Sequence, residues 1–300
     1  MVLYRHMKLL RIAILAQLKS PTITQQLAPL LRDRGHIVDI INLSGVPSEN
    51  FTSHPDIVAL ANYDIVYYRS GLEASVSPVR IIMLEEFLKN TSVQTVNLHY
   101  TEHPKVHSKT YEIQEAEKSG LTVPVTNYTA GETFDTLSAQ LGLPFVSKTD
   151  GGTNGVGVHL VATAEKLLAV QTRYQKVGLF YQAFIPHDFE YRVHIMDGVV
   201  VCIWKKAPKA GDFRSNEAQG GAMLVAEPQY TPQLTELAKV VFATFGFEIF
   251  VADFMLDPNT GTFYFTEINL NPGWINTVNE ITAVNRSAVA ADYFEKICCV

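Results

Sequence analysis

The stretch Tyr264 to Gly273, YFTEINLNPG, ends an apolar run yet carries two polar side chains inside a predicted strand. Side chains two residues apart in a strand share a face, so Glu267 and Asn269 point one way and Ile268 points the other. A buried carboxylate without a partner is costly, so the pair needs hydrogen bonds or a cation. The stretch therefore predicts either a satisfied polar cluster or a ligand site.

A second carboxylate, Asp253, lies in the apolar run EIFVADFML, and the turn DPNTG that follows predicts that this run pairs with the strand carrying Glu267. If the residue numbers of each cross-strand pair sum to an even number, Asp253 faces the same way as Glu267 and Asn269. Two carboxylates and a carboxamide, with no His or Cys nearby, suit a hard cation such as Mg²⁺. The alternative, a polar cluster without metal, explains one such residue better than it explains three.

Composition excludes several classes of protein. The chain has 300 residues, 47% of them hydrophobic and 18% charged, with a net charge of -6, so it is long enough for two or three folded domains and lacks the basic field of a nucleic-acid binder. No apolar run approaches a membrane span, and the N-terminal segment predicts a strand rather than a signal peptide. The three cysteines do not form a disulfide framework. We therefore expect a cytoplasmic protein.

The pattern of predicted elements changes twice along the chain. Strands and helices alternate at first, which predicts a doubly wound parallel sheet over residues 1–98. A compact α+β unit follows over 99–186, and the unit over 187–300 is mainly antiparallel. The fingerprint G-x-G-x-x-G is missing after the first strand, which disfavours a Rossmann-type oxidoreductase.

The segment Lys148 to Gly157, KTDGGTNGVG, lies between two predicted strands. Its lysine precedes the glycines, so it is not a Walker motif, which needs Gly-Lys-Ser/Thr at the start of a helix. A glycine-rich flap beside a lysine suits phosphate binding, although a plain β-hairpin explains the segment equally well.

Basic residues gather on a later pair of predicted strands. In HDFEYRVHIM, Glu190, Arg192 and His194 share one face, and the next strand and loop, CIWKKAPKAGDFRSN, add Lys205, Lys206, Lys209 and Arg214. So much positive charge in an acidic protein predicts an anion site, and the alternative is a solvated strand with surface ion pairs. We expect His194 to be structural.

Taken together, these motifs resemble the ATP-grasp superfamily and, within it, the RimK-like carboxylate–amine ligases. The resemblance rests on Lys148 with its flap, YQAFI, the segment from FEYR to GDFRSN and GG, and Asp253 with EINLNPG. It covers residues 97–274 and is looser over the N-terminal third, which is similar to the family's preceding α/β domain. The implied fold class is α/β and α+β, an ATP-grasp fold behind an N-terminal doubly wound parallel sheet.

The resemblance also implies roles for individual residues. Those expected to contact ATP are Lys109, Lys148, Gly152, Gln182, Ala183, Phe184, Glu190, Arg214, Ser215 and Asn216. Those expected to stabilise the reacting groups are Arg192, Lys205, Arg214 and Asn216. Those expected to hold metal are Asp253, Glu267 and Asn269.

The activity implied by this resemblance is ATP-dependent amide or peptide bond formation through an acyl phosphate, with release of ADP and phosphate. The cofactors would be ATP and two Mg²⁺ ions, with Mn²⁺ as a substitute. The substrates would be an acid and an amine such as glutamate, the acid being a small molecule, a peptide or a carrier-protein terminus. We expect a homo-oligomer that binds neither nucleic acid nor membrane. The rival interpretation is an ATP-binding module without turnover.

Overall fold

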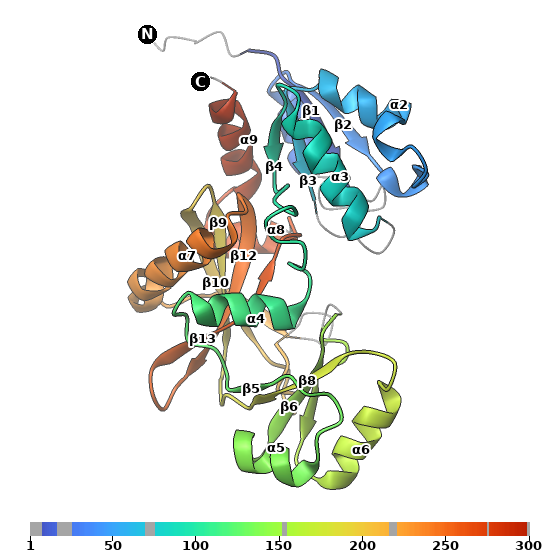
Figure 1. Ribbon diagram of the computed structural model, residues 1–300. Helices are drawn as coiled ribbons and strands as arrows, with labels where there is room; N and C mark the ends of the chain where they lie inside the picture. The colour runs from blue at the N-terminus through green and yellow to red at the C-terminus, as the bar shows by residue number, and fades with distance from the viewer. Residues whose placement is uncertain are drawn as a thin grey trace.

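The computed structural model describes residues 8–16, 26–69, 76–151, 155–215, 221–274 and 276–298. Three β-sheets organise this part of the chain (Figure 1). We call them the N-terminal sheet, with strand order β2-β1-β3-β4, the small sheet, with order β5-β8-β6-β7, and the large sheet, with order β11-β10-β9-β12-β13.

The N-terminal sheet is parallel throughout, as the alternation of strand and helix signals predicts. Its strands are β1 (Arg11–Leu15), β2 (Ile37–Ile41), β3 (Ile65–Tyr68) and β4 (Gln94–Val96). Its helices are α1 (Ala28–Asp33), α2 (Pro55–Val58) and α3 (Pro78–Lys89). The loop after β1, where a dinucleotide fingerprint would stand, lies outside the described residues.

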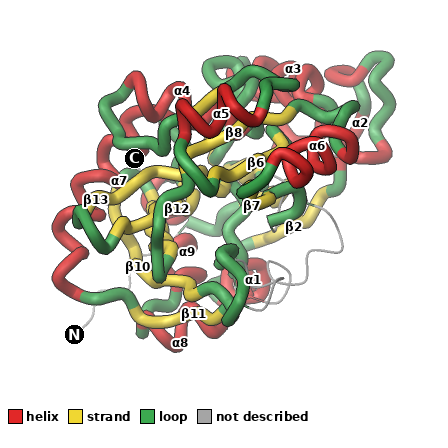
Figure 2. Tube along the Cα trace, turned by 90° about the horizontal axis from the view of Figure 1, so that it is seen from below, coloured by secondary structure: helices red, strands yellow, loops and turns green. Residues whose placement is uncertain are grey.

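The small sheet is antiparallel and has a hydrophobic cluster of its own. Its strands are β5 (Thr126–Asn127), β6 (Phe145–Thr149), β7 (His159–Val161) and β8 (Leu179–Ala183). Figure 2 shows α5 (Phe134–Leu141) and α6 (Ala164–Arg173) on one side of this sheet. The small sheet is thus packed by its own two helices.

The large sheet is also antiparallel. Its strands are β9 (Glu190–Met196), β10 (Val199–Ala207), β11 (Ala222–Val225), β12 (Ile249–Asp257) and β13 (Thr262–Asn269). A tight turn joins β9 to β10, and its residues Asp197 and Gly198 both have positive φ, as a hairpin of right-handed twist requires. A Cβ at Gly198 would lie 2.9 Å from the Phe242 ring, so the turn also packs closely.

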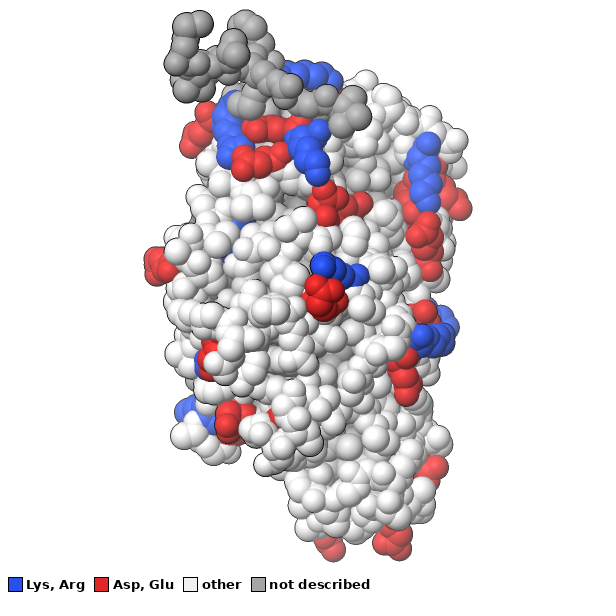
Figure 3. All heavy atoms as spheres, turned by 90° about the vertical axis from the view of Figure 1, so that its left-hand side faces the viewer, with Lys and Arg blue, Asp and Glu red and all other residues white. Residues whose placement is uncertain are grey.

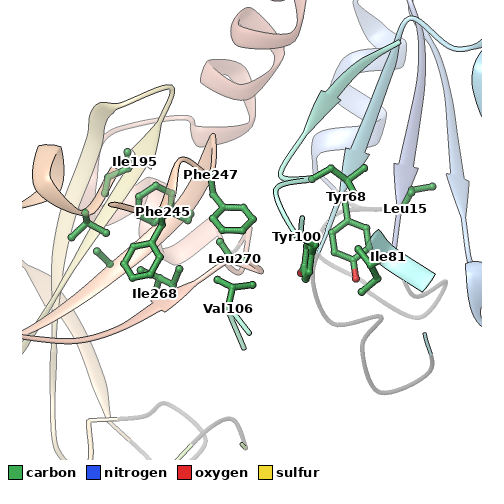
Figure 4. Close-up of a cluster of buried hydrophobic side chains, with 14 of the residues drawn as sticks. Leu15, Tyr68, Ile81, Tyr100, Val106, Ile195, Phe245, Phe247, Ile268 and Leu270 are labelled. Atoms are coloured by element: carbon green, nitrogen blue, oxygen red, sulfur yellow. The ribbon is translucent and has the colours of Figure 1, made fainter. Parts of the chain in front are cut away.

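Helices join the large sheet to its neighbours. Helix α7 (Thr231–Phe245) packs against β9 and β10, and α4 (Lys109–Lys118) packs along β13. The C-terminal helix α9 (Arg286–Ile297) contacts α1, so the end of the chain covers the N-terminal sheet (Figure 1). One hydrophobic cluster runs from Leu15 and Tyr68 through Tyr100 to Phe245 and Ile268 (Figure 4). The N-terminal and large sheets therefore share a core, and the small sheet does not.

Two helices, α8 (Asn276–Thr282) and α9, end the described chain. They are separate because Ala283 has a positive φ and Asn285 caps the second helix by accepting the N–H of Ala288 at 3.1 Å. We keep the division at residues 98 and 186 as a proposal.

The surface agrees with the acidic composition. Figure 3 shows one face of the molecule, on which acidic and basic side chains lie beside one another rather than in a patch of one sign. Among the described helices, none is long and apolar enough to cross a membrane.

Candidate active site

A cavity of about 880 Å³ lies between the small sheet and the large sheet. Its walls include Val146 and Lys148 from β6, Glu190 and Arg192 from β9, and Glu267 from β13. A cavity of this size accommodates a nucleotide-sized ligand. The lining also combines apolar side chains with charged groups of both signs, which is typical of a ligand site.

The strand register brings the three predicted metal ligands together. Asp253 on β12 lies directly opposite Glu267 on β13, and Val251 lies opposite Asn269, so the residue numbers of both pairs sum to an even number. Glu267 and Asn269 line the cavity. The predicted register is therefore present, and Asp253 and Glu267 lie side by side on the cavity face of the sheet.

Both carboxylates are paired with cations. Lys109 at the start of α4 forms an ion pair with Glu267, and Arg192 Nε donates to Asp253 Oδ1 at 2.7 Å. Burial alone would raise the pKa of Glu267, but the Lys109 ammonium holds it at about 2. Burial likewise raises the pKa of Asp253, to about 6, in spite of Arg192 and Lys206. Glu267 thus keeps its negative charge at neutral pH.

The oxygen donors fit a cation that shares its coordination sphere with substrate and water. Within the described part of the chain, no three His, Cys, Asp or Glu side chains gather into a metal site. Asp253 Oδ2 is buried and has no hydrogen-bond partner, which leaves one carboxylate oxygen for a ligand. Magnesium is usually held by one or two carboxylates together with phosphates and water, so this donor set fits it.

Two lysines approach these carboxylates from the small-sheet side. Lys148 lines the cavity from β6, and burial together with the nearby Lys109 ammonium lowers its pKa to about 8. Asp150, two residues later, accepts hydrogen bonds from Ser108 Oγ and from the Thr110 N–H, each at 2.9 Å. The start of α4, and with it Lys109, is therefore fixed to the end of β6.

The predicted adenine contacts lie at the end of β8. Gln182, Ala183 and Phe184 all line the cavity. The Ala183 N–H donates to the Val125 carbonyl at 2.9 Å, and the Gln182 amide donates to Thr126 Oγ1 at 3.0 Å. Ala183 could therefore offer a base only its carbonyl oxygen, because its N–H is already used within the small sheet.

The two adjacent lysines of β10 occupy different sides of the large sheet. Lys206 lines the cavity, is 2.8 Å from Glu190 Oε2 and lies opposite Glu190 in the register. Lys205, which the sequence predicted at the site, instead pairs with Glu227 and sits 3.6 Å from the centre of the Phe189 ring. The structure does not bring Lys205 into the cavity.

A β-bulge explains why Lys206, and not Lys205, faces the cavity. The β9–β10 register shifts by one residue between Val200 and Cys202. Without the shift, the hairpin register would place Lys205, not Lys206, opposite Glu190. An inserted residue sends every later side chain to the other face, so the identity of the lysine that faces the cavity depends on a bulge that sequence patterning does not reveal.

The loop after β10 brings a further arginine to the cavity. Arg214 donates to Asp212 from Nη2 at 2.8 Å, and its Nη1 is 3.5 Å from the Gly155 carbonyl in the flap. Ser215 is buried beside it, with an Oγ that has no hydrogen-bond partner. The two other residues predicted in these loops, Gly152 and Asn216, lie outside the described residues.

Comparison with known proteins assigns the fold and the family. Residues 109–293 match the RimK-like ATP-grasp domain, which is more than half of the chain. The chain belongs to the RimK-like ATP-grasp family. It is a ligase of the class that forms C–N bonds.

Relatives and solved structures agree with this RimK-like assignment. The protein of Coxiella burnetii named probable alpha-L-glutamate ligase is 26% identical over 96% of both chains. The ATP-grasp ligase PsnB, solved with a precursor variant, Mg and ADP, has a TM-score of 0.70 at 14% identity and covers 98% of this chain and 100% of its own. An ATP-grasp RimK domain protein of Sphaerobacter thermophilus has a TM-score of 0.66 at 16% identity, covering 95% and 99% of the two chains. These structures show that the predicted ATP-grasp fold is correct.

Two cavity residues of this RimK-like chain were not predicted. Glu112 on α4 is buried against Glu267, and burial raises its pKa to about 8. His107 lies at the rim, where its Nε2 is 2.5 Å from the Tyr100 hydroxyl. An acidic residue on the buried side of an amphipathic helix is a detectable signal for Glu112, whereas His107 lies in a linker without periodicity.

Proposed function

We propose that this protein joins a carboxylic acid to an amine at the expense of ATP, and that ADP and phosphate are the other products. The observation that supports this most directly is that Glu267 and Asn269 line a cavity that cations approach from both sheets, with the buried Asp253 directly beside Glu267. Phosphoryl transfer needs this arrangement, because catalysis consists mainly of positioning and of neutralising the charge on the phosphates.

The nucleotide would lie between the two sheets. Val146 and Met255 supply apolar walls for the base, whose edge would meet the backbone of Ala183 and Phe184 beside Gln182. Glu190 lies farther along the cavity, where the ribose would be. Lys109 and Lys148 would contact the phosphates, with Ser215 and the undescribed Gly152 and Asn216 completing the set.

Metal would be held by Asp253, Glu267 and Asn269. These residues would hold two Mg²⁺ ions, with Mn²⁺ as a substitute, and the chemistry supplied by the bound ions would be polarisation of the outer phosphates. Lys109 forms an ion pair with Glu267 in this structure. A metal ion bound to Glu267 would therefore compete with Lys109 for the same carboxylate. The Lys109 ammonium would then turn to the phosphates, so that a single ion pair supplies both a metal ligand and a phosphate contact.

The reaction would proceed in two displacements. A carboxylate oxygen of the acid attacks the γ-phosphorus, and the bond between that phosphorus and the ADP oxygen breaks. The amine nitrogen then attacks the acyl carbon, the bond to the phosphate oxygen breaks, and the amine gives up a proton. Arg192 and Arg214 both line the cavity and would offset the negative charge of these two steps.

The substrates are proposed from the relatives. The name probable alpha-L-glutamate ligase favours an amino acid such as glutamate as the amine. The PsnB structure, in complex with a minimal precursor, favours a peptide as the acid, with a small acid or a carrier-protein terminus as alternatives. We propose these substrates for this chain on the basis of 26% identity to the probable alpha-L-glutamate ligase and 16% identity to PsnB.

Product analysis tests the proposal. Incubation with ATP, Mg²⁺, candidate acids and hydroxylamine should release ADP and give a hydroxamate of the acid, because a small nucleophile intercepts the acyl phosphate. Replacing Arg214 with Met should reduce both products together. AMP and pyrophosphate, or ADP without hydroxamate at high hydroxylamine, would contradict the acyl-phosphate reaction.

A further inference from the structure

Glu112 lies where no known motif of the chain predicts a site residue. It stands one helical turn after Lys109 on α4 and is only 4% exposed. Its Oε2 accepts the N–H of Ile268 at 2.9 Å. This N–H belongs to the peptide between Glu267 and Ile268, and Asn269 is the next residue, so the hydrogen bond holds the strand at two of the proposed metal ligands.

The position of β13 in the sheet explains why such a contact is needed. Strand β13 is an edge strand, since the order of the large sheet ends with it. The outward N–H groups of an edge strand have no neighbouring strand to accept them. The segment from α4 to Thr122 supplies acceptors instead, through Glu112 to Ile268 and through the Thr122 carbonyl to the Phe265 N–H at 2.8 Å.

Helix α4 is also tied to the small sheet. Asp150, at the end of β6, accepts from Ser108 Oγ and Thr110 N–H, and the Lys109 N–H donates to the Asp150 carbonyl at 3.2 Å. The helix therefore has polar contacts at one end with the small sheet and, through Glu112, with the metal-binding strand.

We infer that Glu112 is a positioning residue, which acts through the Ile268 peptide to keep Glu267 and Asn269 directed at the metal. The inference rests on the proposed function of this site. It assigns the role to the hydrogen bond rather than to negative charge.

Two conservative variants separate the hydrogen bond from the charge. Glu112→Gln keeps an oxygen that can accept the Ile268 N–H but cannot be charged. Glu112→Asp keeps the carboxyl but shortens the side chain by one C–C bond, about 1.5 Å, which breaks the contact. Glu115→Gln is the matched control, because Glu115 is on the same helix and pairs with Lys118 at 2.6 Å instead.

Calorimetric titration with ADP over a range of Mg²⁺ concentrations gives the readout. We expect Glu112→Asp to raise the Mg²⁺ concentration needed for half-maximal ADP binding about 10-fold or more, as loss of an outer partner of a metal ligand does. Glu112→Gln should stay within about 3-fold of the unsubstituted protein, and Glu115→Gln should not differ from it. ADP affinity without Mg²⁺ should change little in all three variants.

Four results would overturn the inference. An unchanged Mg²⁺ requirement in Glu112→Asp would show that the Ile268 contact is dispensable. A larger loss in Glu112→Gln than in Glu112→Asp would assign the role to charge, and equal losses in both would assign it to packing. If the unsubstituted protein shows no Mg²⁺-dependent ADP binding, the proposed function itself fails and the inference with it. Circular dichroism of each variant verifies that it is folded.

Discussion

The two faces of the large sheet are chemically opposite. On strand β9, Tyr191, Val193 and Ile195 are at most 1% exposed in the shared core. On the other face, Glu190 and Arg192 line the cavity, and their side chains are 16% and 18% exposed. The cavity face is thus partly open, but the larger contrast between the faces is in charge. The difference is that the cavity face buries charges in opposite pairs, which a substrate or metal can exchange for its own.

Among the substitutions considered, one on the cavity face, at Glu267, should cause the largest loss of ATP turnover. Glu267→Gln keeps the volume and can still bond to Lys109, but it removes the charge that a metal requires. We expect ATP turnover to fall on the order of 10³-fold, measured as ADP release at saturating Mg²⁺. The exposed Glu236 on α7 is the control, and Glu236→Gln should leave turnover unchanged. Turnover within ten-fold of the unsubstituted protein would remove Glu267 from the metal site.

The adjacent lysines of β10 provide the sharpest test of the comparison. Lys206→Met leaves Glu190 and Asp253 without a nearby ammonium, so turnover should fall about 10- to 100-fold. Lys205→Met removes a pair with the partly exposed Glu227 and should lower the free energy of unfolding by only about 1 kcal/mol, with kcat unchanged.

Steady-state kinetics and urea unfolding of the two lysine variants check this difference. A loss of kcat in Lys205→Met equal to that in Lys206→Met would show that the two faces do not differ in function. It would also return Lys205 to the reacting groups, where the sequence motif predicted it.

Lys148 should bind additional protons when ADP binds. Burial lowers its pKa to about 8, so it is only partly charged near that pH. Bound phosphates favour the charged ammonium and raise the pKa, so ADP binding at pH 8 should take up about half a proton. Calorimetry in buffers of different ionisation enthalpy measures this uptake. Lys148→Met should abolish it, and uptake that persists in the variant would assign the proton to another group.

The smallest effect on turnover should come from the core face. Val193 is fully buried, and Val193→Ala should lower the free energy of unfolding by about 2 kcal/mol through lost packing. Its kcat should stay within about two-fold at temperatures where the variant is folded, because no cavity group moves. A large loss of kcat without a loss of stability would contradict the separation of the two faces.

Strand patterning predicted much of the site. Period-two alternation placed Glu267 and Asn269 together, and an even register sum would place Asp253 beside them, which is the register that the structure has. The role predicted for Lys205 came from the family motif, and parity could not have checked it, because the bulge near Cys202 inserts one residue before it. Parity is reliable only while a ladder is regular, and a bulge depends on packing that a single strand does not encode.

The sequence by itself determined the succession of a parallel unit, a compact α+β unit and a mainly antiparallel unit, the family motifs and the shared face of Glu267 and Asn269. These follow from local periodicity and from neighbours in one hairpin. Only the tertiary structure decided which carboxylate each cation pairs with, that α9 covers the N-terminal sheet, and that Glu112 reaches the Ile268 peptide 156 residues away. Such contacts join segments distant in the chain, and no local pattern records the position that packing gives them.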